Sequence, residues 1–299
     1  MPDAAPRTPL LLLVALCGAC VDNTFVERPF DDIAVVTGDF DHIESSLDRM
    51  VIPYQRYEGF ICCAAYDPDI DPDGIQLKVE GLFAEVDGNP ELFGYDALFL
   101  NSGTRGLGDY VYNGIEDDDG IVADPERVDV IRRYVEERNR VLVVSDWAYD
   151  IVEAIWPDAI DFYGEDTALD AAQVGSPGRV QADVFTEGLR QDLETEAVSL
   201  HFNYGNWAVM EDVGPDVEVL MRGDVELRLS DEQGTGSLED VPLLVKFSAG
   251  GGTVMVSGFH WSAQTAAMAD TVLTSQIERL QPNTAEDTPT DTAEAGDAG

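Results

Sequence analysis

The sequence predicts an α/β fold: a flavodoxin-like, mostly parallel sheet with helices on both faces, completed by a C-terminal β-hairpin and helix. Two observations support this fold class. Segments 31–41, 95–104 and 140–146 each contain an uninterrupted apolar run, which is typical of strands buried on both faces. Amphipathic helical spacing follows each run. Strands that alternate with helices in this way form a parallel sheet covered on both sides.

Several of these elements have recognisable boundaries. A helix is expected over residues 41–52, directly after the first strand. Asp124 is expected to cap, and Pro125 to begin, a helix that runs to residue 139. Pro157 ends the helix that begins at Trp147. The remaining expected elements are strands within 59–66, 75–80, 197–207, 217–223 and 241–261, the last folded into a hairpin at glycines 250–252, and a helix over about 263–280.

Both ends of the chain are predicted to lie outside the folded domain. Residues 1–19 have the pattern of a secretory signal peptide. Its apolar core, Leu10–Leu16, is too short to span a membrane, which takes about 20 residues. Residues 20–30 are expected to form a tether and 31–280 a single domain. The acidic segment 281–299 has no aromatic or large aliphatic residue and is expected to be a disordered tail.

The end of the signal resembles the cleavage region of bacterial lipoproteins, in which small residues precede a cysteine. Cys17, Gly18 and Ala19 precede Cys20 here. The resemblance implies that Cys20 becomes the lipidated N-terminus and that the protein is exported and anchored by this lipid in the bacterial cell envelope. Val21 is not the aspartate associated with inner-membrane retention, so the implied location is the outer membrane. The alternative is an ordinary secreted protein with an unmodified Cys20.

The charge balance restricts the classes of partner. The chain has 17 basic and 59 acidic residues, for a formal net charge of −42. Such a surface repels nucleic acid and anionic lipid, so no nucleic-acid partner is expected. Cation binding and adaptation to a saline habitat both account for this charge.

Cys62 and Cys63 are adjacent within a strand-like run. The backbone between neighbouring cysteines is too short for relaxed disulfide geometry, so buried, inert thiols are expected. A strained vicinal disulfide and a metal or redox role remain as alternatives.

An acidic loop has the spacing of a calcium site. Asp69, Asp71, Asp73, Gly74 and Glu80 occupy relative positions 1, 3, 5, 6 and 12 of the EF-hand pattern. Pro68 and Pro72 exclude a regular entering helix, and the exiting segment looks like a strand. The sequence therefore leaves two alternatives: a helix-free structural calcium loop on an extracellular adhesion or scaffold module, or a solvated acidic turn.

Ligands of open α/β sheets bind beyond the carboxyl ends of the strands. In this sequence those ends carry polar and aromatic side chains. A strand-end crevice is therefore expected that could bind a small molecule, a glycan or a protein segment. The residues expected to line it are Asn101, Ser102, Gly103, Trp147 and Trp261.

The segments LFLNSG, VLVVSDW and VSGFHWS resemble, in order and spacing, the class I glutamine amidotransferase-like superfamily, which includes ThuA-like proteins. The resemblance implies an oxyanion loop at residues 101–103, a nucleophile at Ser145 and a base at His260, with Asp146 or another carboxylate orienting the imidazole. The alternative roles are a helix N-cap for Ser145 and an interior histidine for His260.

Two departures from the superfamily pattern decide between functions. No cysteine stands at the strand end, which argues against glutamine hydrolysis, and Ser262 replaces the acid that follows the histidine. The leading interpretation is therefore a degenerate, non-catalytic domain with a binding or structural role. A serine hydrolase that uses Ser145 and His260 is the alternative.

Overall fold

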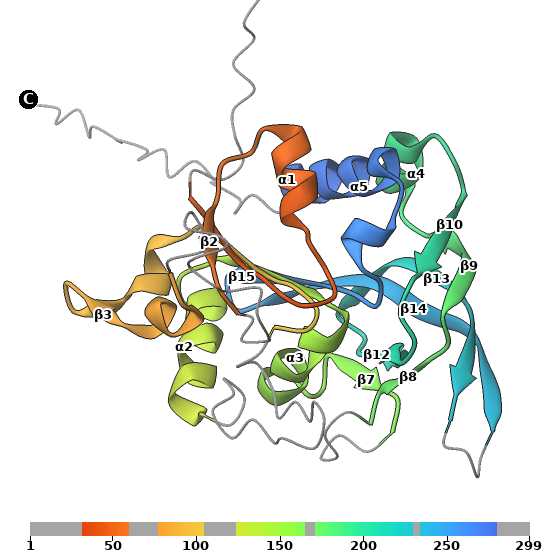
Figure 1. Cartoon of the computed structure of the whole chain (residues 1–299), viewed down its shortest axis with the longest axis horizontal. Helices are drawn as coiled ribbons and strands as arrows, with labels where there is room; N and C mark the ends of the chain where they lie inside the picture. Colours follow the sequence, from red (N-terminus) through yellow and green to blue (C-terminus); the bar gives the residue numbers. More distant parts are fainter. Residues whose placement is uncertain (1–31, 60–76, 105–123, 165–170, 230–233, 280–299) are drawn as a thin grey trace, which may run out of the picture.

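The computed structural model describes residues 32–59, 77–104, 124–164, 171–229 and 234–279. A mixed sheet forms its centre, with helices on both faces (Figure 1). The parallel part has the strand order β2-β1-β5-β6-β15, which is 2-1-3-4-5 along the chain and is the order of flavodoxin-like folds. The predicted fold class is confirmed. The parallel strands are β1 (Ile33–Val36), β2 (Gln55–Tyr57), β5 (Ala97–Leu100), β6 (Val141–Ser145) and β15 (Gly252–Ser257).

Antiparallel strands extend the sheet beyond β15. The predicted C-terminal hairpin is present, and its first strand, β14, pairs with β15 on one side and with β13 on the other. Strands β9 and β10 complete this edge. The bounds are β9 (Gly178–Val184), β10 (Ala197–Phe202), β13 (Val217–Arg228) and β14 (Thr235–Ala249). Shorter strands are β3 (Glu85–Val86), β4 (Asn89–Pro90), β7 (Ile160–Phe162), β8 (Gln173–Gly175), β11 (Trp207–Ala208) and β12 (Met210–Val213).

The helices divide between the two faces of the sheet. Helices α1 (Glu44–Met50), α4 (Glu187–Leu193) and α5 (Ala266–Arg279) cover one face, and α2 (Pro125–Glu136) and α3 (Asp150–Ile155) cover the other (Figure 1). Successive strand residues point to opposite faces. Val143 therefore joins the first core and Val144 the second, each almost fully buried. Two-sided burial explains why these strands are apolar throughout.

Several predicted boundaries hold. Asp124 accepts a hydrogen bond from the Glu126 backbone N–H at 3.0 Å, and Pro125 occupies the first helical position, as predicted for α2. The predicted strand over 75–80 is wrong in its described part. Lys78 makes a single bridge to Glu58, and a 3-10 helix begins at Val79.

The predicted strand at 59–66 lies, apart from Gly59, outside the described residues. In the second half of the chain, α4 and the strands β7, β8, β9 and β12 were not predicted. Among the described residues, no helix has both the length and the apolar character needed to cross a bilayer.

Candidate functional site

The backbone turns sharply where β6 ends. Asp146 has φ +44°, in the left-handed region, and opens a 3-10 helix, Asp146–Tyr149, that leads into α3. A non-glycine residue in this region costs on the order of 1–2 kcal/mol. The strained residue of the turn is therefore Asp146, one position after Ser145, the predicted nucleophile. Ser145 still pairs in register with Ser257 of β15 and belongs to the strand.

The Ser145 side chain makes neither of the contacts that its two predicted roles require. Its hydroxyl accepts a hydrogen bond from the Ser102 backbone N–H at 2.9 Å, and the residue is 1% exposed. It stands at the N-cap of the 3-10 helix, but its side chain makes no capping hydrogen bond. The hydroxyl instead ties the end of β6 to the loop that follows β5.

The Asp146 carboxylate lies in a dense set of hydrogen bonds. Its Oδ2 is 2.7 Å from Nε2 of His260 and accepts from the Ser102 hydroxyl at 3.3 Å. Its Oδ1 accepts from the Ala208 backbone N–H at 2.6 Å. Asp146 is 2% exposed, and His260 is 4% exposed. The two side chains form a buried ion pair between the ends of β6 and β15.

Both ring nitrogens of His260 have partners. Nε2 lies 2.7 Å from Asp146 and 3.1 Å from the Ser102 hydroxyl, and Nδ1 lies 2.9 Å from Oδ1 of Asn203. Burial alone lowers the pKa of His260, but the hydrogen bond and charge of Asp146, with the charge of Asp41, raise the pKa above its ordinary value. Burial raises the pKa of Asp146. The pair therefore retains a proton to higher pH than a free imidazole.

Asp41 is a site residue that the sequence analysis missed. It is completely buried, and its carboxylate accepts hydrogen bonds at 3.0 Å from the backbone N–H groups of Trp261 and Ser262. These bonds fix the turn that presents His260. The superfamily pattern has an acid at the position of Ser262. Here the Ser262 backbone N–H instead donates to the carboxylate of Asp41, which follows β1. The only signal for this contact was the position of Asp41 shortly after a buried strand.

The loops after β1 and β5 close against each other. Asp39 N–H donates to the Gly103 carbonyl at 3.3 Å, and Phe40 N–H donates to the Ser102 carbonyl at 3.1 Å. A Cβ atom on Gly38 would stand 2.1 Å from that same carbonyl oxygen, so the approach requires glycine. The strand order reverses between β1 and β5. The backbone of the loops that follow these two strands therefore fills the place where such folds bind ligands.

Most of the predicted crevice residues are buried. Asn101 holds the start of α1, where its Oδ1 accepts from Ile43 N–H at 3.1 Å. Ser102 and Gly103 belong to the closed loop pair. Trp261 is 1% exposed and packs on Phe259 within the core, so its prediction as a crevice residue is wrong. Only Trp147 is partly exposed.

Aromatic side chains cover the ion pair on the side of Trp147. The Phe40 ring centroid lies 4.8 Å from that of Trp147 and 5.3 Å from that of Tyr204. Tyr204 is 46% exposed, and its ring lies 5.3 Å from the imidazole of His260. We call Phe40, Trp147 and Tyr204 the aromatic surface. It is the outward-facing part of the site, because the polar groups beneath it are almost fully buried.

The polar arrangement does not match that of a catalytic triad. A triad places its acid on one ring nitrogen and its hydroxyl nucleophile on the other. Here Asp146 and the Ser102 hydroxyl both meet Nε2 of His260, while Asn203 meets Nδ1. The predicted pair of Ser145 and His260 is not formed, because the Ser145 hydroxyl bonds to the Ser102 backbone.

The predicted calcium and lipid sites lie largely outside the described residues. Asp69, Asp71 and Asp73, like Cys20 and the adjacent cysteines 62 and 63, are outside them. Glu80 is exposed on the 3-10 helix that begins at Val79. Within the described ranges, no group of three or more histidine, cysteine, aspartate or glutamate side chains could hold a metal ion. The calcium loop stays a prediction.

Comparisons with solved structures find similar architectures at low identity. A glutamine amidotransferase from Thermotoga maritima is 9% identical, with a TM-score of 0.42 over 85% of this chain and 90% of that chain. A second glutamine amidotransferase, from Methylobacillus flagellatus, is 10% identical, with a TM-score of 0.42 over 81% and 74%. A cytoplasmic protein from Salmonella typhimurium LT2 is 14% identical, with a TM-score of 0.47 over 84% and 99%. No family model and no curated protein matches the chain.

Proposed function

We propose that this chain is a cell-envelope lipoprotein whose amidotransferase-like domain binds a ligand at the carboxyl edge of its sheet and catalyses no reaction. The order of elements supports the superfamily assignment: a closed loop follows β5, a strained turn into helix follows β6, and a histidine follows β15. A carboxylate, Asp146, stands at the strained turn.

The observation that carries the non-catalytic assignment is the buried pair of Asp146 and His260. A general base needs a free ring nitrogen beside the nucleophile's proton. Nε2 of His260 faces a carboxylate at 2.7 Å, and protonation of the ring is favoured by that charge. The Asp146 carboxylate also accepts from Ala208 and Ser102. These bonds give the pair a structural role, in which it locks two strand ends together.

The aromatic surface supports the binding role. Trp147 and Tyr204 pack on Phe40 and are both partly exposed, and each aromatic side chain can bury a large contact area on a ligand. The Trp147 indole is held by a hydrogen bond from Nε1 to the Asn206 carbonyl at 2.6 Å, so the ring is positioned before any ligand arrives. A glycan or a peptide with an apolar face fits these contacts.

Labelling with a fluorophosphonate separates the binding role from the serine hydrolase alternative. That alternative requires the Ser145 hydroxyl to leave the Ser102 N–H and reach His260. We expect no labelling of the intact exported protein, alongside an active serine hydrolase as positive control. Labelling that disappears in Ser145→Ala or in Ser102→Ala would overturn the non-catalytic assignment.

Ligand binding is tested by saturation-transfer NMR against panels of soluble oligosaccharides and peptides. We expect transfer to at least one panel member, and loss of that transfer in Trp147→Ala. Phe185→Ala is the matched control, because Phe185 is an exposed aromatic residue outside the aromatic surface. Equal transfer in Trp147→Ala and wild type would contradict binding at the aromatic surface.

The envelope location is tested independently through Cys20. Each buried methylene of an acyl chain contributes about 0.8 kcal/mol of membrane affinity. Cys20→Ala is therefore expected to move the protein from the membrane fraction to the soluble fraction. Retention of the variant in membranes would contradict lipid anchoring.

A further inference from the structure

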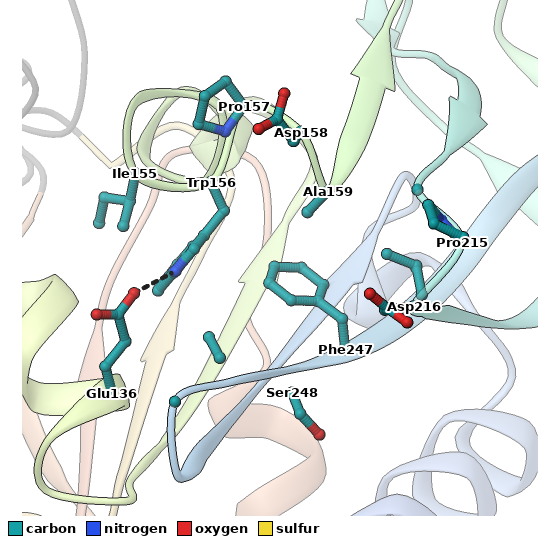
Figure 2. Close-up of a pocket in the computed structure, with 14 residues that line it drawn as sticks. Glu136, Ile155, Trp156, Pro157, Asp158, Ala159, Pro215, Asp216, Phe247 and Ser248 are labelled. Atoms are coloured by element: carbon teal, nitrogen blue, oxygen red, sulfur yellow. Dashed lines mark hydrogen bonds between the residues drawn. The ribbon is translucent and has the colours of Figure 1, made fainter.

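A pocket lies at the opposite ends of the central strands from the candidate site. It has a volume of about 400 Å³ and adjoins the turn between β14 and β15, which precedes β15, whereas His260 follows that strand (Figure 2). At 3.3 Å per residue, the length of β15 separates the two sites by roughly 20 Å. The lining includes Trp156, Phe247, Asp158, Asp216 and Glu136. The pocket shares none of its lining residues with the aromatic surface.

The walls of this pocket are fixed by the fold. The Trp156 indole donates from Nε1 to Glu136 at 3.0 Å, the bond drawn in Figure 2, and its ring packs edge-on to Phe247 with centroids 5.7 Å apart. The rim is a pair of turns joined by a hydrogen bond from Gly214 N–H to the Ala159 carbonyl at 2.8 Å. The pocket is therefore preformed rather than made by a ligand.

Among the described residues that line the pocket, the charged side chains are all carboxylates: Glu136, Asp158 and Asp216. Glu136 is already engaged, because its other oxygen accepts from Arg132 at 2.9 Å. Asp158 and Asp216 are exposed, and neither side chain makes a hydrogen bond or ion pair within the described part of the chain. In Figure 2 the Asp216 carboxylate lies on the side of Phe247, and the Asp158 carboxylate lies beside Pro157.

We propose that this pocket binds an organic cation whose ammonium group carries alkyl substituents. Trp156 is the side chain whose ring face attracts a cation most strongly, and Phe247 supplies a second aromatic wall. The carboxylates of Asp158 and Asp216 attract a cation. They would repel an anion, and a neutral ligand would leave their charge unpaired. Alkyl substituents suit the proline and aliphatic lining between them. This proposal is independent of the proposed function.

The experiment uses choline and its neutral isostere 3,3-dimethylbutan-1-ol, which differ in charge and share a shape. Titration of the full folded protein is followed through the indole N–H resonances, with potassium chloride matching the ionic strength. We expect choline to shift the Trp156 resonance saturably, and the neutral isostere to leave it unchanged. Trp156→Phe assigns that resonance by removing it. Equal shifts with both compounds, or none with choline at tens of millimolar, would overturn the proposal.

Variants separate binding in the pocket from general attraction to an acidic protein. Choline binding to the variants is followed by saturation transfer to the choline methyl groups, because Trp156→Leu lacks the indole N–H. This variant is expected to weaken choline binding about two- to thirtyfold, the range of a cation–π contact. The double variant Asp158→Asn/Asp216→Asn should weaken it at least about fivefold, from the loss of two nearby charges. Both side chains are exposed, so the fold should be retained. Asp183→Asn, an exposed carboxylate on β9 outside the lining, is the matched control. Equal weakening in all three would show non-specific attraction and refute the site.

Discussion

Replacing Asp146 with asparagine tests whether the buried pair is structural. Asparagine keeps the shape of the side chain and tolerates φ +44°, and its oxygen can still accept from Ala208 N–H. The change therefore removes the charge opposite His260 and little else. Breaking a buried pair by removal of one partner costs about 3–5 kcal/mol. We expect about 3 kcal/mol of destabilisation, at the low end, because the imidazole can lose its proton and accept from the amide.

A double-mutant cycle with His260→Gln isolates the interaction. Urea unfolding, followed by circular dichroism at pH 6, gives the free energy of unfolding of the wild type, both single variants and the double variant. Contacting charged residues are expected to couple by about 1–3 kcal/mol, so the double variant should be more stable than the sum of the single losses predicts. The left-handed turn adds an internal control: Asp146→Gly should be more stable than Asp146→Ala by about 1 kcal/mol.

Two results would refute this reasoning. A coupling energy below about 0.5 kcal/mol would mean that the pair contributes no specific stability. An Asp146→Asn variant that is more stable than the wild type would indicate that the carboxylate is a strained group kept for chemistry, as functional residues often are. Either outcome would return the site to the enzymatic alternatives.

Further predictions concern pH, packing and calcium. The pKa of His260 is raised in the folded protein, so the stability that its protonation contributes is complete below the ordinary pKa of 6.5 and is lost as pH rises through the folded value. The difference in unfolding free energy between wild type and His260→Gln should therefore shrink from pH 5.5 to pH 8.5. A constant difference would contradict a stabilising pair. Gly38→Ala forces a Cβ to within 2.1 Å of the Ser102 carbonyl and should cost about 1–3 kcal/mol in thermal unfolding, so an unchanged melting temperature would show that the loops separate freely. If the predicted acidic loop binds calcium, millimolar calcium should raise the melting temperature, and Glu80→Gln should reduce that rise. A calorimetric titration with calcium that shows no heat of binding would mean that the loop is a solvated turn.

The fold could be predicted because its central strands are buried on both sides. Val141 to Val144 carry no polar residue, since each points into one of two cores. The antiparallel strands behave differently. In β9 exposed and buried residues alternate, a weaker pattern, and its partner β13 comes only after several intervening elements. Their order in the sheet depends on contacts that local periodicity does not report.

The site could be predicted in location but not in detail. The sequence places Asp146 and His260 after two strands, and the structure brings their side chains together because those strands are parallel neighbours. The error of one residue at Ser145 arose because the sequence does not show where β6 stops pairing with β15. Ala148, a small residue two positions after Asp146, was an available signal for the true turn. Asp41 was missed because it reaches Trp261 across 220 residues of chain.

The arrangement of the sheet has a consequence for the order of folding. Strands β13, β14 and β15 are neighbours in both sequence and space, so their hairpins close short loops. By contrast, β6 joins β15 in parallel only after a long excursion of the chain, and the Asp146 and His260 side chains that meet there are 114 positions apart. Loop closure favours the local pairings first. We expect amide protection in pulse-labelling to appear in β13 and β14 before it appears in β6. The ion pair would then form among the last contacts, and its presence would mark chains whose sheet is complete.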